Sequence, residues 1–126
     1  MPKKIPEAQK KLVWLYDQYA KYNKKFWDNR LTNEILIQLV GQETVGYSID
    51  CRSKNPLMEE GCTTTFEGNA PPVLEIAEFI MNYPPFAKGV LLHEMVHVSG
   101  VVGHGRAFKD EVKKIAKLGA LEVLLL

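Results

Sequence analysis

The residues with the clearest chemical potential are His93, Glu94 and His97, which form an H-E-x-x-H pattern. On a helix, residues four apart project from one face, one turn above the other, so the two imidazoles can bind one metal ion. Glu94 lies about 100° around the helix axis, where its carboxylate can reach a water on the open side of the metal. This pattern is typical of catalytic zinc, which takes three protein ligands and a water.

The third ligand is expected to be His104, the one remaining histidine of the sequence. Gly100 predicts the end of the motif helix, and Gly103 predicts a bend that returns His104 toward the metal. The sequence therefore predicts Zn²⁺ held by the three histidines, with Glu94 as general base. The alternative is a buried helix whose histidines are hydrogen-bonded core residues. Apolar residues at helical spacing beside the histidines support the motif helix, and the full set of residues favours the zinc site.

Size and composition indicate a globular protein with one domain, residues 1–126. The chain has 126 residues, of which 46% are hydrophobic and 25% charged, enough for a real core. The net charge of +1 implies no bulk attraction to nucleic acid or membrane. No apolar run approaches the ~20 residues that span a bilayer, and no secretory signal is visible. We therefore expect a cytoplasmic protein with no membrane partner. Cys51 and Cys62 are too few for a four-thiolate zinc ribbon, and we expect free thiols, although one bridge is compatible with the sequence.

Lysines are concentrated in the first quarter of the chain, at positions Lys3, Lys4, Lys10, Lys11, Lys21, Lys24 and Lys25. This pattern is typical of the solvated face of a helix, which is the interpretation we favour. The alternative is a modest basic patch that associates weakly with the phosphate backbone of DNA.

The hydrophobic pattern predicts an α+β fold. Apolar residues three and four apart predict an amphipathic helix over about 6–29, with Trp14 and Trp27 near the edge of its buried stripe. Its expected buried residues are Leu12, Leu15, Tyr19, Tyr22 and Phe26. Strands are predicted over 33–40, 45–51, 62–66 and 73–77. An alternative for the last segment is that the chain continues as helix over residues 78–81. The motif helix follows over 86–99, and a C-terminal helix over 105–117 ends near Gly119. The expected architecture is thus an N-terminal helix, a small three- to four-stranded sheet, the motif helix and a C-terminal helix.

The chain resembles the SprT-like metallopeptidases in three stretches. Residues 15–31 match a helix that ends in an aromatic residue, a short polar turn and a leucine. Residues 91–97 hold the H-E-x-x-H motif, and residues 104–108 match the family's His-Gly-x-x-Phe. The resemblance covers about residues 12–115, and the two flanking stretches carry it because many zinc peptidases share the central motif.

The resemblance implies a zincin-type peptidase domain with ligands His93, His97 and His104 and general base Glu94. Members of the family include proteases that clear proteins crosslinked to DNA. This chain departs from many relatives in two ways: six residues separate His97 from His104, and no cysteine-rich zinc ribbon follows. It is similar to a minimal catalytic module. Metzincins are a poorer match, because their third histidine comes one residue earlier than His104.

The expected activity is peptide-bond hydrolysis, with a protein or peptide as substrate and DNA-associated proteins as a candidate class. Alternatives are a peptidase that cleaves one phage or host regulator, and a non-enzymatic, zinc-stabilised binding module. Arg106, Tyr83 and Tyr47 are candidates for a second oxyanion donor, although a surface or packing role is favoured for each.

Overall fold

The computed structural model describes residues 7–40, 61–64, 71–101 and 104–120. The helices are α1 (Glu7–Trp27), the 3₁₀ helix η3 (Glu78–Asn82), α3 (Pro84–Val98), α4 (Arg106–Ile115) and a last π-helical segment η4 (Ala116–Ala120). The strands are β1 (Leu36–Val40), β2 (Gly61–Thr64) and β3 (Val73–Ala77). Within these ranges the order is helix, sheet, then helices, which confirms the predicted α+β class.

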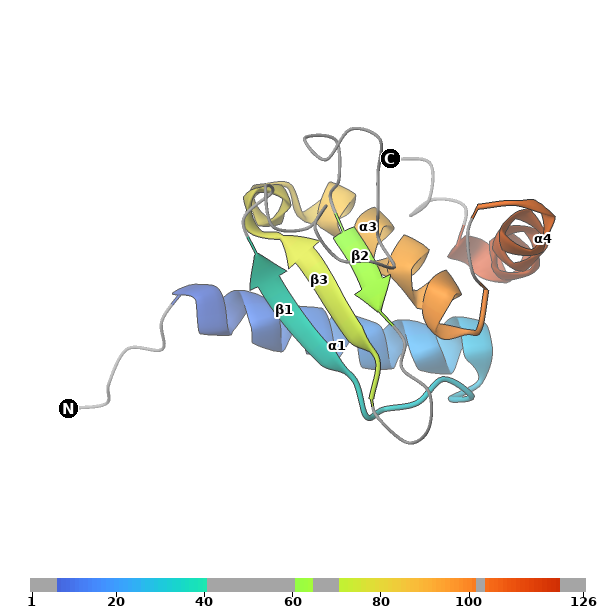
Figure 1. Cartoon of the computed structure of the whole chain (residues 1–126), viewed down its shortest axis with the longest axis horizontal. Helices are drawn as coiled ribbons and strands as arrows, with labels where there is room; N and C mark the ends of the chain where they lie inside the picture. Colours follow the sequence, from blue (N-terminus) through green and yellow to red (C-terminus); the bar gives the residue numbers. More distant parts are fainter. Residues whose placement is uncertain (1–6, 41–60, 65–70, 102–103, 121–126) are drawn as a thin grey trace.

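The strands of the described residues form one mixed sheet in the order β1-β3-β2. β1 runs parallel to β3, with Ile37 opposite Leu74, whereas β2 runs antiparallel to β3. The side chains of Ile37, Leu74 and Ile76 are buried, with exposed fractions of 2% or less. Helices α1 and α3 cover one face of the sheet (Figure 1), and both contact it. The core therefore lies between this sheet face and the two helices.

Strand positions agree with the sequence pattern to within a few residues. The strand predicted over 33–40 begins at Leu36, and the one predicted over 62–66 occupies Gly61–Thr64. β3 is found as predicted, and residues 78–82 follow it as η3 rather than extending the strand. The strand predicted over 45–51 lies outside the described residues.

Helix α1 buries the predicted stripe, including Leu15, Tyr19 and Phe26, but the expected place of Trp27 was wrong. Trp27 is 2% exposed and belongs to the core. The reason is that α1 is covered over a wider arc than one stripe. Asn23, which is also buried, lies four residues before Trp27, so the two residues form a second buried row beside the first.

The turn after α1 is fixed by hydrogen bonds from within the helix. Asp28 and Asn29 have positive φ angles of 52° and 61°, a conformation that these residue types tolerate. The buried Asn23 amide donates to the carbonyl of Leu31 at 2.9 Å and accepts from its N–H at 3.0 Å. The chain thereby reverses its direction within a few residues and continues into β1.

None of the helices within the described ranges is both long and apolar enough to cross a membrane. The cytoplasmic location and the single-domain organisation stay predictions. Cys51 lies outside the described residues, so the state of the two thiols is untested.

Candidate metal centre

Helix α3 carries the H-E-x-x-H motif through the middle of the core. Its first two residues are Pro84 and Pro85, which suit a helix start because the missing N–H groups have no partner there. The helix therefore begins two residues earlier than predicted. Gly100, at φ 109°, follows its end, as expected for a helix stop. Six of its residues are buried apolar side chains: Ala87, Val90, Leu91, Leu92, Met95 and Val96. The backbone beneath His93 and His97 is therefore held firmly by packing on neighbouring elements.

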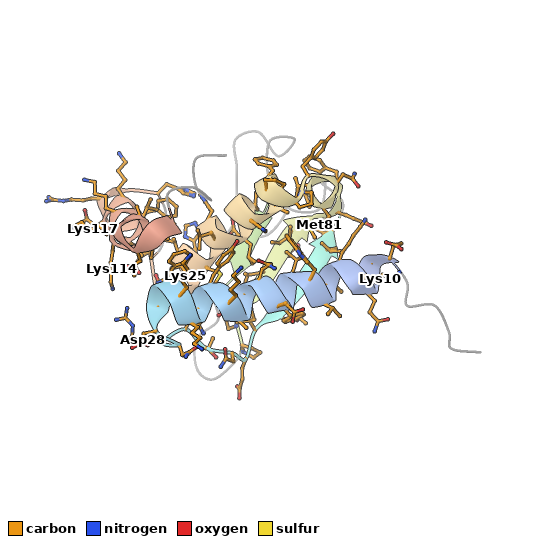
Figure 2. The ribbon with its side chains drawn as sticks, turned by 180° about the vertical axis from the view of Figure 1, so that it is seen from behind. Lys10, Lys25, Asp28, Met81, Lys114 and Lys117 are labelled. Atoms are coloured by element: carbon orange, nitrogen blue, oxygen red, sulfur yellow. The ribbon has the colours of Figure 1, made fainter. Side chains whose placement is uncertain are left out.

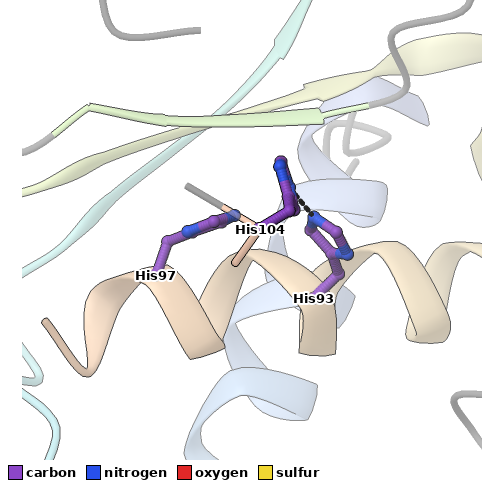
Figure 3. A group of neighbouring side chains, drawn as sticks. All are labelled: His93, His97 and His104. Carbon is purple, nitrogen blue, oxygen red and sulfur yellow. Dashed lines mark hydrogen bonds between the residues drawn. The ribbon is translucent and has the colours of Figure 1, made fainter. Parts of the chain in front are cut away.

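The three histidines predicted as ligands converge in space (Figure 3). His93 and His97 project from α3 on the side where β2 crosses the helix, and His104 reaches them from the segment before α4. The Nε2 atoms of His93 and His104 are 3.0 Å apart. One ring nitrogen from each histidine forms a group whose members all lie within 4.8 Å of one another. Gly103, the predicted bend, lies outside the described residues.

This donor set fits a zinc ion. With Zn–N distances of ~2.0–2.1 Å, a tetrahedral ion separates its nitrogen ligands by about 3.3 Å. The 3.0 Å separation of His93 and His104 is close to that value, and all the donors lie within 4.8 Å of one another, so rotations of the imidazoles allow all three to share one ion. Three neutral nitrogen ligands with one coordination position left over are characteristic of catalytic rather than structural zinc.

The tautomer of His97 is set by a backbone carbonyl that the sequence could not identify. His97 Nδ1 lies 2.8 Å from the carbonyl oxygen of Val101. Because a carbonyl oxygen can only accept, Nδ1 carries the proton, and Nε2 keeps its lone pair for a ligand. A hydrogen bond of this kind to the far nitrogen is the usual support for a metal-binding histidine.

The surroundings of His93 and His97 favour their neutral forms. Burial, together with like-charge repulsion from His97 and His104, lowers the pKa of His93 to about 4. Burial also lowers the pKa of His97, opposed by the Val101 hydrogen bond and assisted by His104. Neutral imidazole is the form that binds a metal, so both residues are ready to do so at pH 7.

Glu94 is next to the cluster but comes from a different face of α3. Its side chain is 6% exposed, and Oε2 lies 4.0 Å from Nε2 of His93. At this distance the carboxylate is beside the imidazole nitrogens and can reach a small molecule placed between them. This is the position that a general base for an attacking water requires.

A phenylalanine packs against the three histidines, and the H-E-x-x-H motif by itself did not predict it. The ring centroid of Phe108 lies 4.8 Å from that of His93, 5.1 Å from His97 and 5.0 Å from His104. The three imidazole centroids are themselves 5.0–5.2 Å apart. Phe108 thus forms an apolar platform in contact with every ring of the cluster. Its place four residues after His104 was the signal in the sequence.

The candidates for an oxyanion donor gain no support. Arg106 has a side chain that is 94% exposed and pairs with Asp110 at 4.0 Å. Tyr83, at the N-cap of α3, is 63% exposed. Both are therefore directed to solvent, and Tyr47 lies outside the described residues.

Comparisons of the chain with protein families, with curated proteins and with solved structures found no match. The likeness to SprT-like metallopeptidases therefore rests on the three stretches of sequence quoted above. The main indication of function is the arrangement of His93, His97, His104 and Glu94.

Proposed function

We propose that this protein is a zinc-dependent endopeptidase of the SprT-like type, with a zincin-like arrangement of its helices and sheet. The observation that carries the proposal is the convergence of three imidazoles with the Glu94 carboxylate beside them. Zinc would be held by His93, His97 and His104, and the substrate would be a protein or peptide. Proteins associated with DNA are the candidate substrate class that the resemblance suggests.

Zinc bound there would supply Lewis acidity, which polarises a carbonyl and makes a water acidic near pH 7. Glu94 takes the proton from the attacking water as the new carbon–oxygen bond forms. It then gives that proton to the leaving amine as the carbon–nitrogen bond breaks. The low exposure of Glu94 excludes bulk water from the carboxylate and strengthens its interaction with the reacting groups.

A non-enzymatic zinc module is the main competing function. Structural zinc sites fill all four positions with protein ligands. The metal-binding group found within the described residues consists of three histidines. A three-histidine group leaves one coordination position for water, and a nearly buried carboxylate beside it can serve as the general base, which favours the enzyme.

The proposal includes a weak association with DNA through lysine side chains. Two lysines near the start of α1 pair with acidic residues, Lys10 with Glu7 and Lys11 with Glu78. At the other end of α1, Lys25 lies beside Gly119, and Figure 2 places Lys114 and Lys117 at this same end of the molecule. Binding through this end predicts an affinity for single-stranded DNA that falls steeply with salt. Binding that is insensitive to salt, or absent at 50 mM salt, would contradict it.

The proposed function is tested by metal content and cleavage together. Purified protein should hold about one zinc per chain, and the double variant His93→Ala/His97→Ala should hold none. A panel of DNA-binding proteins, with and without single-stranded DNA, should show cleavage by the wild type. Glu94→Gln should keep the zinc and lose ~10²–10⁴-fold in rate, because the general base is gone.

Each alternative gives a different result in the same experiment. Zinc without cleavage, together with unfolding on chelation, identifies a binding module. Cleavage restricted to one regulator identifies a specific processing peptidase. A Glu94→Gln variant with full activity contradicts the general-base assignment, and a wild type without zinc contradicts the ligand assignment.

A further inference from the structure

His104 lacks the support that α3 gives to the other two histidines. It is an exposed residue that precedes α4, and its ring reaches the cluster from outside the motif helix. Its position relative to His93 and His97 therefore depends on where α4 is placed. Any contact that fixes α4 against the rest of the molecule is a candidate for controlling the metal centre.

Phe108 is the point where α4 meets the cluster. It lies in the first turn of α4, one turn after His104, and its ring contacts all three imidazoles. A shift of α4 along or away from α3 would separate this ring from His93 and His97 and carry His104 with it. Because Phe108 packs on the imidazoles, the position of α4 determines how the three histidines lie relative to one another.

The polar contact that fixes α4 comes from the first helix. The indole Nε1 of Trp27 donates a hydrogen bond of 2.8 Å to Oε1 of Glu111. Glu111 lies three residues after Phe108, so the bond is made within one turn of the platform. Trp27 is itself held by the core, because it is 2% exposed and packs edge-on against Phe26. A rigid donor in the core thus sets the position of an acceptor on a largely exposed helix.

We propose that Trp27 and Glu111 are positioning residues for the metal centre. Their hydrogen bond holds α4 so that Phe108 stays against the imidazoles and His104 stays within reach of His93 and His97. Neither residue touches the metal or the substrate. This inference rests on the metal-binding part of the proposed function, and it adds residues of α1 and α4 to the machinery of that site.

The test compares zinc affinity with fold stability in matched variants. Zinc affinity is measured by competition with a chromophoric chelator, and unfolding of the metal-free protein by circular dichroism. Glu111→Ala removes the acceptor from a half-buried position and should weaken zinc binding, by no more than the ~10–100-fold that losing a direct hydrogen-bond partner of a ligand costs. Glu111→Gln keeps an oxygen acceptor for the indole and should restore most of the affinity.

Two controls separate positioning from general damage. Asp110→Ala removes the neighbouring carboxylate, which pairs with Arg106 at the surface, and should leave zinc affinity unchanged. Trp27→Phe keeps an aromatic ring but removes the donor, so it should weaken zinc binding as Glu111→Ala does. The double variant Trp27→Phe/Glu111→Ala should be no weaker than the more affected single variant, since both remove the same bond.

A spectroscopic measurement adds a readout that stability alone does not move. With Co²⁺ in place of zinc, the visible absorption of Glu111→Ala should change in shape and intensity, because the third imidazole no longer holds its position. Wild-type zinc affinity in Glu111→Ala, an equal loss in Asp110→Ala, or no rescue by Glu111→Gln would each overturn the inference while leaving the proposed function intact. A wild type that binds no zinc would overturn both.

Discussion

Helices α3 and α4 both contribute to the candidate metal centre, but α3 is packed in the core and α4 is largely exposed. α3 has six buried apolar residues and supplies His93, Glu94 and His97. In α4 one residue, Ile115, is fully buried, and the segment before this helix supplies His104. The candidate centre therefore combines residues on α3, which the core holds in place, with His104, whose position depends on a few contacts of α4.

Because of this difference, the residues on α3 and the histidine before α4 are held in place to different degrees. His93, Glu94 and His97 are fixed by the packing of α3, which must be intact whenever the protein is folded. The third ligand depends on an exposed helix, and elements with few buried contacts open at lower free-energy cost than the core does. The three-histidine cluster can therefore lose His104 without global unfolding of the protein.

The largest expected effect is on stability, from a substitution in α3. Leu91 is fully buried, so Leu91→Ala should cost about 2–5 kcal/mol of unfolding free energy through lost burial and a cavity. Val112→Ala in α4 should cost less, because Val112 is only partly buried against the core. Denaturant unfolding of the metal-free variants measures both values. Equal losses would show that α4 is as much a part of the core as α3.

The next effect is on local opening, when zinc is removed. Zinc at 100 times its dissociation constant should stabilise the states that bind it by about 2.7 kcal/mol. Because a zinc ion held by all three histidines would join His104 to α3, chelation should speed amide hydrogen exchange more in residues 106–115 than in residues 84–98. Mass spectrometry of exchange with and without chelator measures this. A uniform change across both helices would mean that the metal stabilises the whole fold rather than the attachment of α4.

The smallest expected effect is the pH dependence that His93 gives to the metal-free protein. Its pKa is about 4 in the folded chain against an ordinary 6.5, so the unfolded chain takes up the proton first. The contribution of His93 to stability is complete above pH 6.5 and is lost as the pH falls toward 4. Thermal unfolding of wild type and His93→Gln across this range should show a shallower dependence in the variant. Parallel curves would contradict the lowered pKa of His93 in the folded chain.

The sequence predicted those parts of the site that depend on local spacing. His93 and His97 are four residues apart on a helix with apolar flanks, so their shared face follows from helix geometry. The role of the Val101 carbonyl could not be predicted, because every residue carries the same backbone acceptor. The bond from Trp27 to Glu111 could not be predicted either, since it joins residues 84 positions apart. The order β1-β3-β2 likewise depends on tertiary pairing rather than on the pattern within each strand.

The sequence distance between Trp27 and Glu111 also has a consequence for how the molecule is made. A contact that closes a loop of this length carries a large entropic cost, which is repaid only after nearer contacts have formed. During synthesis, α1, the sheet and α3 leave the ribosome before α4 does, since the chain emerges from its N-terminus. His104 therefore joins last, so the nascent chain carries His93, Glu94 and His97 before the three-histidine cluster is complete.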